Sequence, residues 1–128
     1  MMFTQLKKDT EKSEHGITER PWGKFIVINT IFHENTMIYK EKLLVVNPDT
    51  SLQLHKHMNY TELWIGESPF TYILEDERGQ LKEYQAEPYV RIFIPKNRKH
   101  KIISGNEELN VFEAQIGEIA EDDNIKFV

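Results

Sequence analysis

From Trp22 onward the chain is a succession of short runs rich in β-branched and aromatic residues, and turn-forming residues interrupt them at regular intervals. Nine runs have the pattern of β-strands: 24–32, 37–46, 51–57, 61–65, 71–75, 82–84, 90–94, 100–104 and 109–115. The breaks between them contain Pro, Gly, Asn or Asp, residues that favour turns. No segment has the period of a long amphipathic helix. The pattern predicts an all-β fold, either a closed barrel or a double-sheet jelly roll, in which few strand edges are exposed.

The chain of 128 residues has the size of one ordinary domain, and 11% of its residues are aromatic. Such a chain can bury a sizeable core. The sequence shows no internal repeat and no low-complexity tract. Residues 1–18 are polar, of mixed charge and without a sustained period, so we predict an N-terminal arm that ends in a short helix or an edge strand. Residues 19–128 are then one barrel domain.

Composition limits the classes of partner. The formal net charge of −5 provides no broad cationic surface for nucleic-acid phosphates. No apolar run approaches the roughly 20 residues that span a bilayer, and the N-terminus lacks the apolar stretch of a secretory signal. We therefore expect a cytoplasmic protein that binds neither nucleic acid nor membrane. Because the chain has no Cys, any metal must use His, carboxylate or amide ligands.

Residues with metal-ligand chemistry cluster in the middle of the chain. Alternation along the run 51–57 would place Gln53, His55 and His57 on one face of a strand. After a turn, Glu62 can return beside the histidines, and His100 follows a later turn that an adjacent strand could bring to the same point. Three imidazoles and one carboxylate would hold a divalent Mn, Fe, Co, Ni or Zn ion. The residue types alone are equally compatible with a solvated set of side chains.

The spacing of these residues resembles a known superfamily. His-x-His-x4-Glu over 55–62, followed by Pro-x-Asn-x2-His over 95–100, is similar to the two motifs of the cupins. That resemblance implies a small β-barrel with four metal ligands, here His55, His57, Glu62 and His100. Three supporting positions depart from the motifs: Asp49 and Asn97 stand in place of Gly, and Ser104 in place of Asn.

A narrower resemblance covers nearly all of the chain from residue 19 to the end. Glu-Arg-Pro-Trp-Gly at 19–23, Ser-Leu-Gln-x-His-x-His at 51–57 and Glu-x-Gln-x-Gly-Glu at 113–118 are similar to the type II mannose-6-phosphate isomerase cupin. The resemblance implies isomerisation of mannose 6-phosphate to fructose 6-phosphate with one divalent metal. Many relatives carry a guanylyltransferase domain before this module, and we expect the present chain to be a stand-alone cupin without that activity.

Two alignments of the motif region with this family are possible. Matching Ser-Leu-Gln-x-His-x-His to the family by identity requires a two-residue shift of the alignment between Pro48 and Glu62. The ungapped match, which we prefer, places His57 on the family's first His and puts Asn59 and Tyr60 in place of its second His and an Arg. The loss of that Arg leaves the substrate and the activity open.

Further site residues are predicted for catalysis and for substrate binding. Gln53 would orient a hydroxyl or a metal-bound water, and Glu113 would carry the proton; in the alternative, Gln53 is an exposed strand residue and Glu113 pairs with a barrel lysine. The candidates for binding the phosphate of a sugar phosphate are Lys40, Lys42, Arg91 and Arg98. We interpret the acidic stretch 118–123 as a solvated loop.

Two other functions stay open. The chain could be a non-catalytic cupin that binds a sugar or a nucleotide sugar, or an iron-dependent oxygenase with the same ligand set. In each case we expect a homodimer, since small barrels with an N-terminal arm commonly associate.

Overall fold

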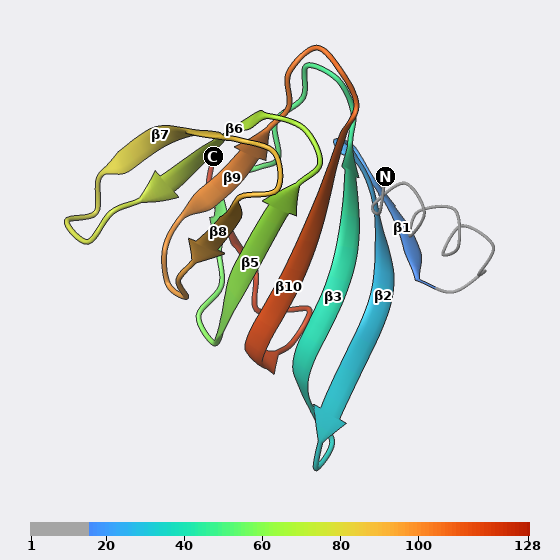
Figure 1. Cartoon of the computed structure of the whole chain (residues 1–128). Helices are drawn as coiled ribbons and strands as arrows, with labels where there is room; N and C mark the ends of the chain where they lie inside the picture. The colour runs from blue at the N-terminus through green and yellow to red at the C-terminus, as the bar shows by residue number, and fades with distance from the viewer. Residues whose placement is uncertain (1–15) are drawn as a thin grey trace.

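The computed structural model describes residues 16–128, so the predicted arm lies outside the described residues up to position 15. All regular structure in the described part is β-strand (Figure 1). The strands are β1 (Ile17–Arg20), β2 (Gly23–His33), β3 (Thr36–Val46), β4 (His55–Lys56), β5 (Tyr60–Gly66), β6 (Phe70–Glu75), β7 (Leu81–Ala86), β8 (Arg91–Ile94), β9 (His100–Ile103), β10 (Leu109–Ile119) and β11 (Ile125–Lys126). Among these residues no helix has the length and apolar character needed to cross a bilayer.

The strands form two antiparallel sheets. One has six strands in the order β1-β2-β3-β10-β5-β8, and the other has five in the order β11-β4-β9-β6-β7. Figure 1 shows β2, β3, β10 and β5 side by side as long strands, with the β6–β7 hairpin reaching away from them. The order is not sequential in either sheet, because the chain crosses repeatedly between the sheets. This topology confirms the all-β prediction and its jelly-roll form.

The main core lies between the two sheets. The six-stranded sheet contributes side chains such as Val46, Trp64 and Val111, and the five-stranded sheet contributes Phe70 and Ile102. Their exposed fractions are 3% or less, so most of the apolar stabilisation comes from this layer. Trp64, with 1% exposure, is one of the largest fully buried side chains of this layer.

Strict alternation along β5 decides which side chains enter the space between the sheets. Every second residue of β5 from Tyr60 is buried and the intervening ones are only half-buried. Glu62 therefore points inward, between Tyr60 and Trp64, with 2% exposure. A carboxylate in such a position is costly unless it is hydrogen-bonded or paired with positive charge.

All nine predicted runs contain a strand, and two short strands are additional to them. The run 51–57 pairs regularly only at β4, with an isolated bridge from Ser51 to Ile103. The additional strands are β1 and β11. β1 lies at the edge of its sheet and crosses the predicted boundary between residues 18 and 19.

The departures from the cupin motifs are structurally accommodated. Asp49 and Asn97 both have positive φ, 51° and 61°, the conformation that Gly usually supplies and that Asp and Asn tolerate best among other residues. The Ser104 hydroxyl donates to the Asn47 carbonyl (2.6 Å) and accepts from the Thr50 amide (2.9 Å). The loops thus keep their turns without the expected residues.

Candidate metal centre

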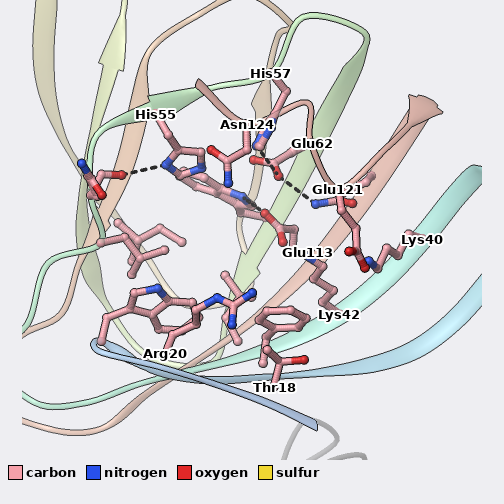
Figure 2. Close-up of a pocket in the computed structure, with 18 of the residues that line it drawn as sticks. Thr18, Arg20, Lys40, Lys42, His55, His57, Glu62, Glu113, Glu121 and Asn124 are labelled. Carbon is pink, nitrogen blue, oxygen red and sulfur yellow. Dashed lines mark hydrogen bonds and ion pairs between the residues drawn. The ribbon is translucent and has the colours of Figure 1, made fainter. Parts of the chain in front are cut away.

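The four predicted ligands converge at one point. His55 and His100 are direct cross-strand partners on β4 and β9, His57 follows β4, and Glu62 enters from β5 in the opposite sheet. One ligand atom of each residue lies within 4.8 Å of those of the other three. The ring centroids of His55 are 5.0 Å from His57 and 4.3 Å from His100. Figure 2 shows His55, His57 and Glu62 along one side of a pocket.

Backbone carbonyls fix the tautomer of all three imidazoles. The Nδ1 atoms of His55, His57 and His100 lie 2.7, 2.6 and 2.8 Å from the carbonyl oxygens of Gln53, Asp123 and Arg98. A carbonyl can only accept, so each Nδ1 carries the proton and donates it. His57 Nδ1 also lies 2.7 Å from the Tyr60 hydroxyl, whose oxygen can share that proton as a second acceptor. Each Nε2 lone pair is then directed to the common point. This is the orientation in which metal-ligating histidines are usually held.

The atoms that face the common point lack other partners. Nε2 of His57, Nε2 of His100 and Oε1 of Glu62 are buried without a hydrogen bond. His100 Nε2 lies 3.1 Å from Glu62 Oε1, and His57 Nε2 lies 3.4 Å from Glu62 Oε2. Lone pairs that face one another in this way require a shared positive charge. The three imidazoles and one carboxylate therefore fit a divalent ion.

Burial and the contacts within the cluster shift the pKa values of its carboxyl and imidazole groups. Burial works against the charge of Glu62, but its close contacts with the His100 and His57 imidazoles outweigh burial and hold the pKa of Glu62 well below its ordinary value. Burial also lowers the pKa of His57, yet the hydrogen bond and charge of Glu62 raise it overall. Burial, followed by the charge of His100, lowers the pKa of His55 to about 4. Glu62 thus stays anionic and attracts one positive charge, a proton or a metal ion.

A cavity of about 900 Å³ opens from the cluster (Figure 2). Its lining includes the predicted residues Gln53, Glu113, Lys40 and Lys42. Gln53 is exposed, as the alternative interpretation predicted, and its side-chain amide donates to the Phe127 carbonyl (3.2 Å). The structure therefore brings these four predicted residues to the same cavity as His55, His57 and Glu62.

Glu113 is a buried carboxyl group beside the ligands. It is 6% exposed, and its Oε1 accepts from Trp64 Nε1 (3.2 Å). Burial, the charge of Glu62 and a hydrogen bond with Glu62 raise its pKa well above the ordinary value. No ion pair joins it to Lys40 or Lys42 within the described residues, although Lys42 is near enough to oppose the shift.

Arg91 and Arg98 are not brought to this cavity. Arg91 is exposed and pairs with Ile65, on the face of the six-stranded sheet opposite to the cavity. Arg98 lies in the turn before β9, where its Nη1 donates to the Glu75 carbonyl (3.4 Å). Neither residue lines the cavity, so we leave both out of the functional proposal.

Sequence reasoning missed Arg20, a cation on β1. Its guanidinium carbon lies 5.2 Å from the centroid of the Phe25 ring, and Lys42 Nζ lies 4.2 Å from the same centroid. Both cations line the cavity, and in Figure 2 they lie across the pocket from His57. The family-like segment 19–23 contained the signal for Arg20, but nothing in the sequence showed that β1 would border the site.

Asp123 was also missed, because we interpreted the stretch 118–123 as a solvated loop. Its carboxylate accepts the amides of Met58 (2.8 Å) and Asn59 (2.9 Å), and its carbonyl accepts from His57. That interpretation is wrong for Asp123, which contacts the residues that form the cluster.

The structure also decides between the two alignments. Asn59, which the ungapped match puts in place of a ligand histidine, is exposed and lies outside the cluster. His55 and His57 are the pair that converges, which is the pair of the shifted alignment. Tyr60 stacks on the His57 ring with centroids 4.3 Å apart.

Comparison with known proteins gives the family. Residues 7–128 match the family described as mannose-6-phosphate isomerase C-terminal. The chain belongs to this family. No curated protein sequence matches it significantly. The fold is a cupin, as the resemblance implied.

Solved structures with the same fold are distant in sequence. A variant of oxalate decarboxylase from Bacillus subtilis superposes with a TM-score of 0.76 at 13% identity, over 90% of this chain and 31% of that one. The capsular polysaccharide assembling protein CapF from Staphylococcus aureus gives 0.71 at 14% identity, over 87% and 33%. Protein SO0799 from Shewanella oneidensis gives 0.70 at 12% identity, over 87% and 78%. The chain therefore spans about a third of the length of the first and second of these proteins.

Proposed function

We propose that this cupin is a metal-dependent sugar-phosphate isomerase that interconverts mannose 6-phosphate and fructose 6-phosphate. The observation that carries the proposal is the set of partnerless buried atoms, His57 Nε2, His100 Nε2 and Glu62 Oε1. Two of these residues, His57 and Glu62, line a cavity large enough for a hexose phosphate. Membership of the mannose-6-phosphate isomerase C-terminal family supports the choice of reaction.

His55, His57, Glu62 and His100 would hold the ion. When bound, a divalent ion supplies Lewis-acid polarisation of the sugar carbonyl without a redox change. The carbonyl acceptors behind the imidazoles keep the Nε2 lone pairs in place, and Gln115 Nε2 donates to Glu62 Oε2 (3.2 Å), which orients the carboxylate. Gln53, at the cavity wall, would orient a substrate hydroxyl.

Glu113 is our candidate for the group that moves the proton between C1 and C2. Aldose–ketose isomerisation needs one group that both removes and returns a proton, and such a group works best when its pKa is near the working pH. The pKa of Glu113 is raised well above the ordinary value of a carboxyl group, and so toward the working pH. Its position in the cavity wall beside Glu62 supports the role, and the Trp64 indole N–H holds one oxygen in place.

Arg20, Lys40 and Lys42 are our candidates for the phosphate site. Lys40 is 8% exposed, and its pKa is lowered first by burial and then by the charge of Lys42. Two cations that repel one another at a cavity wall would be stabilised by an anion between them. Local positive charge can thus attract a sugar phosphate to a protein whose net charge is −5.

A coupled assay with mannose 6-phosphate tests the proposal, using protein stripped with chelator and reloaded with Mn²⁺, Co²⁺ or Zn²⁺. We expect turnover only after loading, and a loss of about 100-fold or more in kcat for Glu113→Gln with metal content unchanged. Glu118→Gln, at an exposed position on the same strand, is the matched control and should keep wild-type activity. Full metal loading without turnover of any phosphosugar would contradict the proposal.

A non-catalytic cupin that binds a sugar or nucleotide sugar is the second candidate. It is favoured by Met58, which in the shifted alignment stands where the type II isomerase pattern has an Arg directly after its second His. Thermal-shift screening of the metal-loaded protein with sugars and nucleotide sugars separates the two functions. Stabilisation by such a ligand without turnover would support binding alone.

We also propose a cytoplasmic homodimer, as expected from the sequence. The outer face of the six-stranded sheet supports self-association, because Ile31, Phe93 and Ile116 on that face are 46%, 58% and 47% exposed. Size-exclusion chromatography with light scattering measures the state directly. A monomer at all concentrations would contradict this expectation.

A further inference from the structure

The C-terminal segment 120–127 lies along the outer edge of the strand that supplies the His-x-His pair. β11 pairs with β4 through Ile125↔Lys56 and Lys126↔His55, and the Phe127 amide donates to the Leu54 carbonyl (2.8 Å). On its other side β4 has a single register pair, His55↔His100. The Asn97 amide also donates to the His57 carbonyl (2.6 Å) on that other side. The C-terminal segment, which we call the strap, therefore supports one of the two sides of the His-x-His segment.

Asp123 is the residue through which the strap holds the turn after the second histidine. Its two carboxylate oxygens accept separate amides, Oδ1 from Met58 (2.8 Å) and Oδ2 from Asn59 (2.9 Å). Its own carbonyl accepts from His57 Nδ1 (2.6 Å). One residue thus holds the backbone after His57 and contacts its ring Nδ1, which the Tyr60 hydroxyl also approaches (2.7 Å).

The strap also contacts the chain next to the ligands through Phe127. Two lysine ammonium groups lie over the Phe127 ring, with Lys99 Nζ 4.3 Å and Lys56 Nζ 5.8 Å from its centroid. The Phe127 carbonyl also accepts from Gln53. Lys99 precedes the ligand His100, so the strap contacts the chain next to three of the four ligands.

We propose that Asp123 is a positioning residue for the metal ligand His57, and that docking of the strap and binding of the metal stabilise one another. The inference rests on the proposed metal site but not on the proposed isomerase activity. A docked strap holds the His57 Nε2 lone pair toward the common point, which lowers the ordering cost of binding an ion. By thermodynamic linkage, a bound ion must stabilise the docked strap to the same extent.

The first test is Co²⁺ titration of the chelator-treated full chain, followed by calorimetry and by the visible spectrum of the bound ion. Asp123→Ala keeps the backbone carbonyl but loses the carboxylate that holds the Met58 and Asn59 amides, so the strap that carries the carbonyl is less firmly docked. We expect this variant to bind Co²⁺ about 10- to 100-fold more weakly, the usual cost of losing support for a metal ligand. Asp123→Asn keeps one carbonyl acceptor and should lie between the two. Asp122→Ala removes the same charge from the exposed neighbouring position and should match the wild type in affinity and spectrum.

The second test uses the wild-type chain alone and therefore does not depend on the folding of a variant. Amide hydrogen exchange is measured for Met58, Asn59 and Phe127 with and without Co²⁺. We expect all three amides to exchange at least about tenfold more slowly with the ion, because opening the strap would then require weakening of the metal site.

The outcomes separate this inference from the site on which it rests. Wild-type protein that binds Co²⁺, with equal affinity in Asp123→Ala and unchanged exchange of the three amides, would overturn the coupling and leave the metal site intact. Wild-type protein that binds no Co²⁺, Mn²⁺ or Zn²⁺ would overturn both. An Asp122→Ala variant as weak as Asp123→Ala would show a general charge effect and would also overturn the inference.

Discussion

The burial of His55 predicts how the metal-free protein responds to acid. Its side chain is half-buried on the cavity wall, and its pKa is lowered from 6.5 to about 4 by burial and then by His100. The folded-state pKa is below the unfolded one, so the unfolded chain binds more protons between these values. Stability contributed by neutral His55 is therefore present above pH 6.5 and is lost as pH falls toward 4.

The size of the effect follows from the two pKa values. Each pKa unit corresponds to about 1.4 kcal/mol, so the complete loss is about 3 kcal/mol and the loss between pH 8 and pH 5 is about 2 kcal/mol. His57 has the opposite sign, because its raised pKa adds stability at low pH that is lost as pH rises through the folded-state value. Glu62, with its lowered pKa, contributes stability that is complete above its ordinary pKa and is lost progressively as pH falls below it.

The contribution of His55 to the free energy of unfolding can be measured by urea unfolding of the wild type and of His55→Gln. Both chains are unfolded in the presence of chelator at pH 8, 7, 6 and 5. Both chains retain His57 and Glu62, so the difference between their pH profiles reports His55. We expect the wild type to lose about 2 kcal/mol more than the variant between pH 8 and pH 5. Parallel profiles would refute the reasoning, since they would mean that His55 is as easily protonated in the folded protein as in the unfolded chain.

Three further predictions concern stability. Ser104→Ala removes the hydroxyl that joins two backbone groups of the loop 47–50, and we expect a loss of about 1–3 kcal/mol in the free energy of unfolding, measured with urea. Gly23→Ala would place a Cβ 2.0 Å from a β3 carbonyl at φ 147°, so its thermal midpoint should fall by several degrees, whereas Gly105→Ala, with no atom within 4 Å, should change little. Zn²⁺ at about 100 times its Kd should stabilise the wild type by about 2.7 kcal/mol and His100→Ala far less; equal stabilisation of the two would contradict the ligand assignment.

The ligand set could be predicted from the sequence because local geometry and spacing determine it. Only His55 of the pair lies in a regular strand, yet the extended backbone around β4 still directs His57 to the same side. Glu62 follows from the alternation of β5, whose period of two is fixed by the burial of Trp64. His100 follows from the turn that precedes β9.

The rest of the site could not be predicted because it depends on which distant segments become neighbours. β1 and β11 are short and polar, and their pairing with β2 and β4 leaves little trace in local sequence. Arg20 and Asp123 reach the site through these two strands. Arg91 alternates to the outer face of β8, while Arg98 turns to Glu75, so positive charge near a motif was not a sufficient guide.

The most direct measurement of the central claim is the anomalous scattering of a crystal of this chain grown with Mn²⁺ or Zn²⁺ and recorded on both sides of the metal absorption edge. We predict one strong peak per chain, ligated by Nε2 of three imidazoles and by the Glu62 carboxylate. Density showing these four side chains in their present positions with no anomalous peak among them, at metal concentrations that load the protein in solution, would contradict the account.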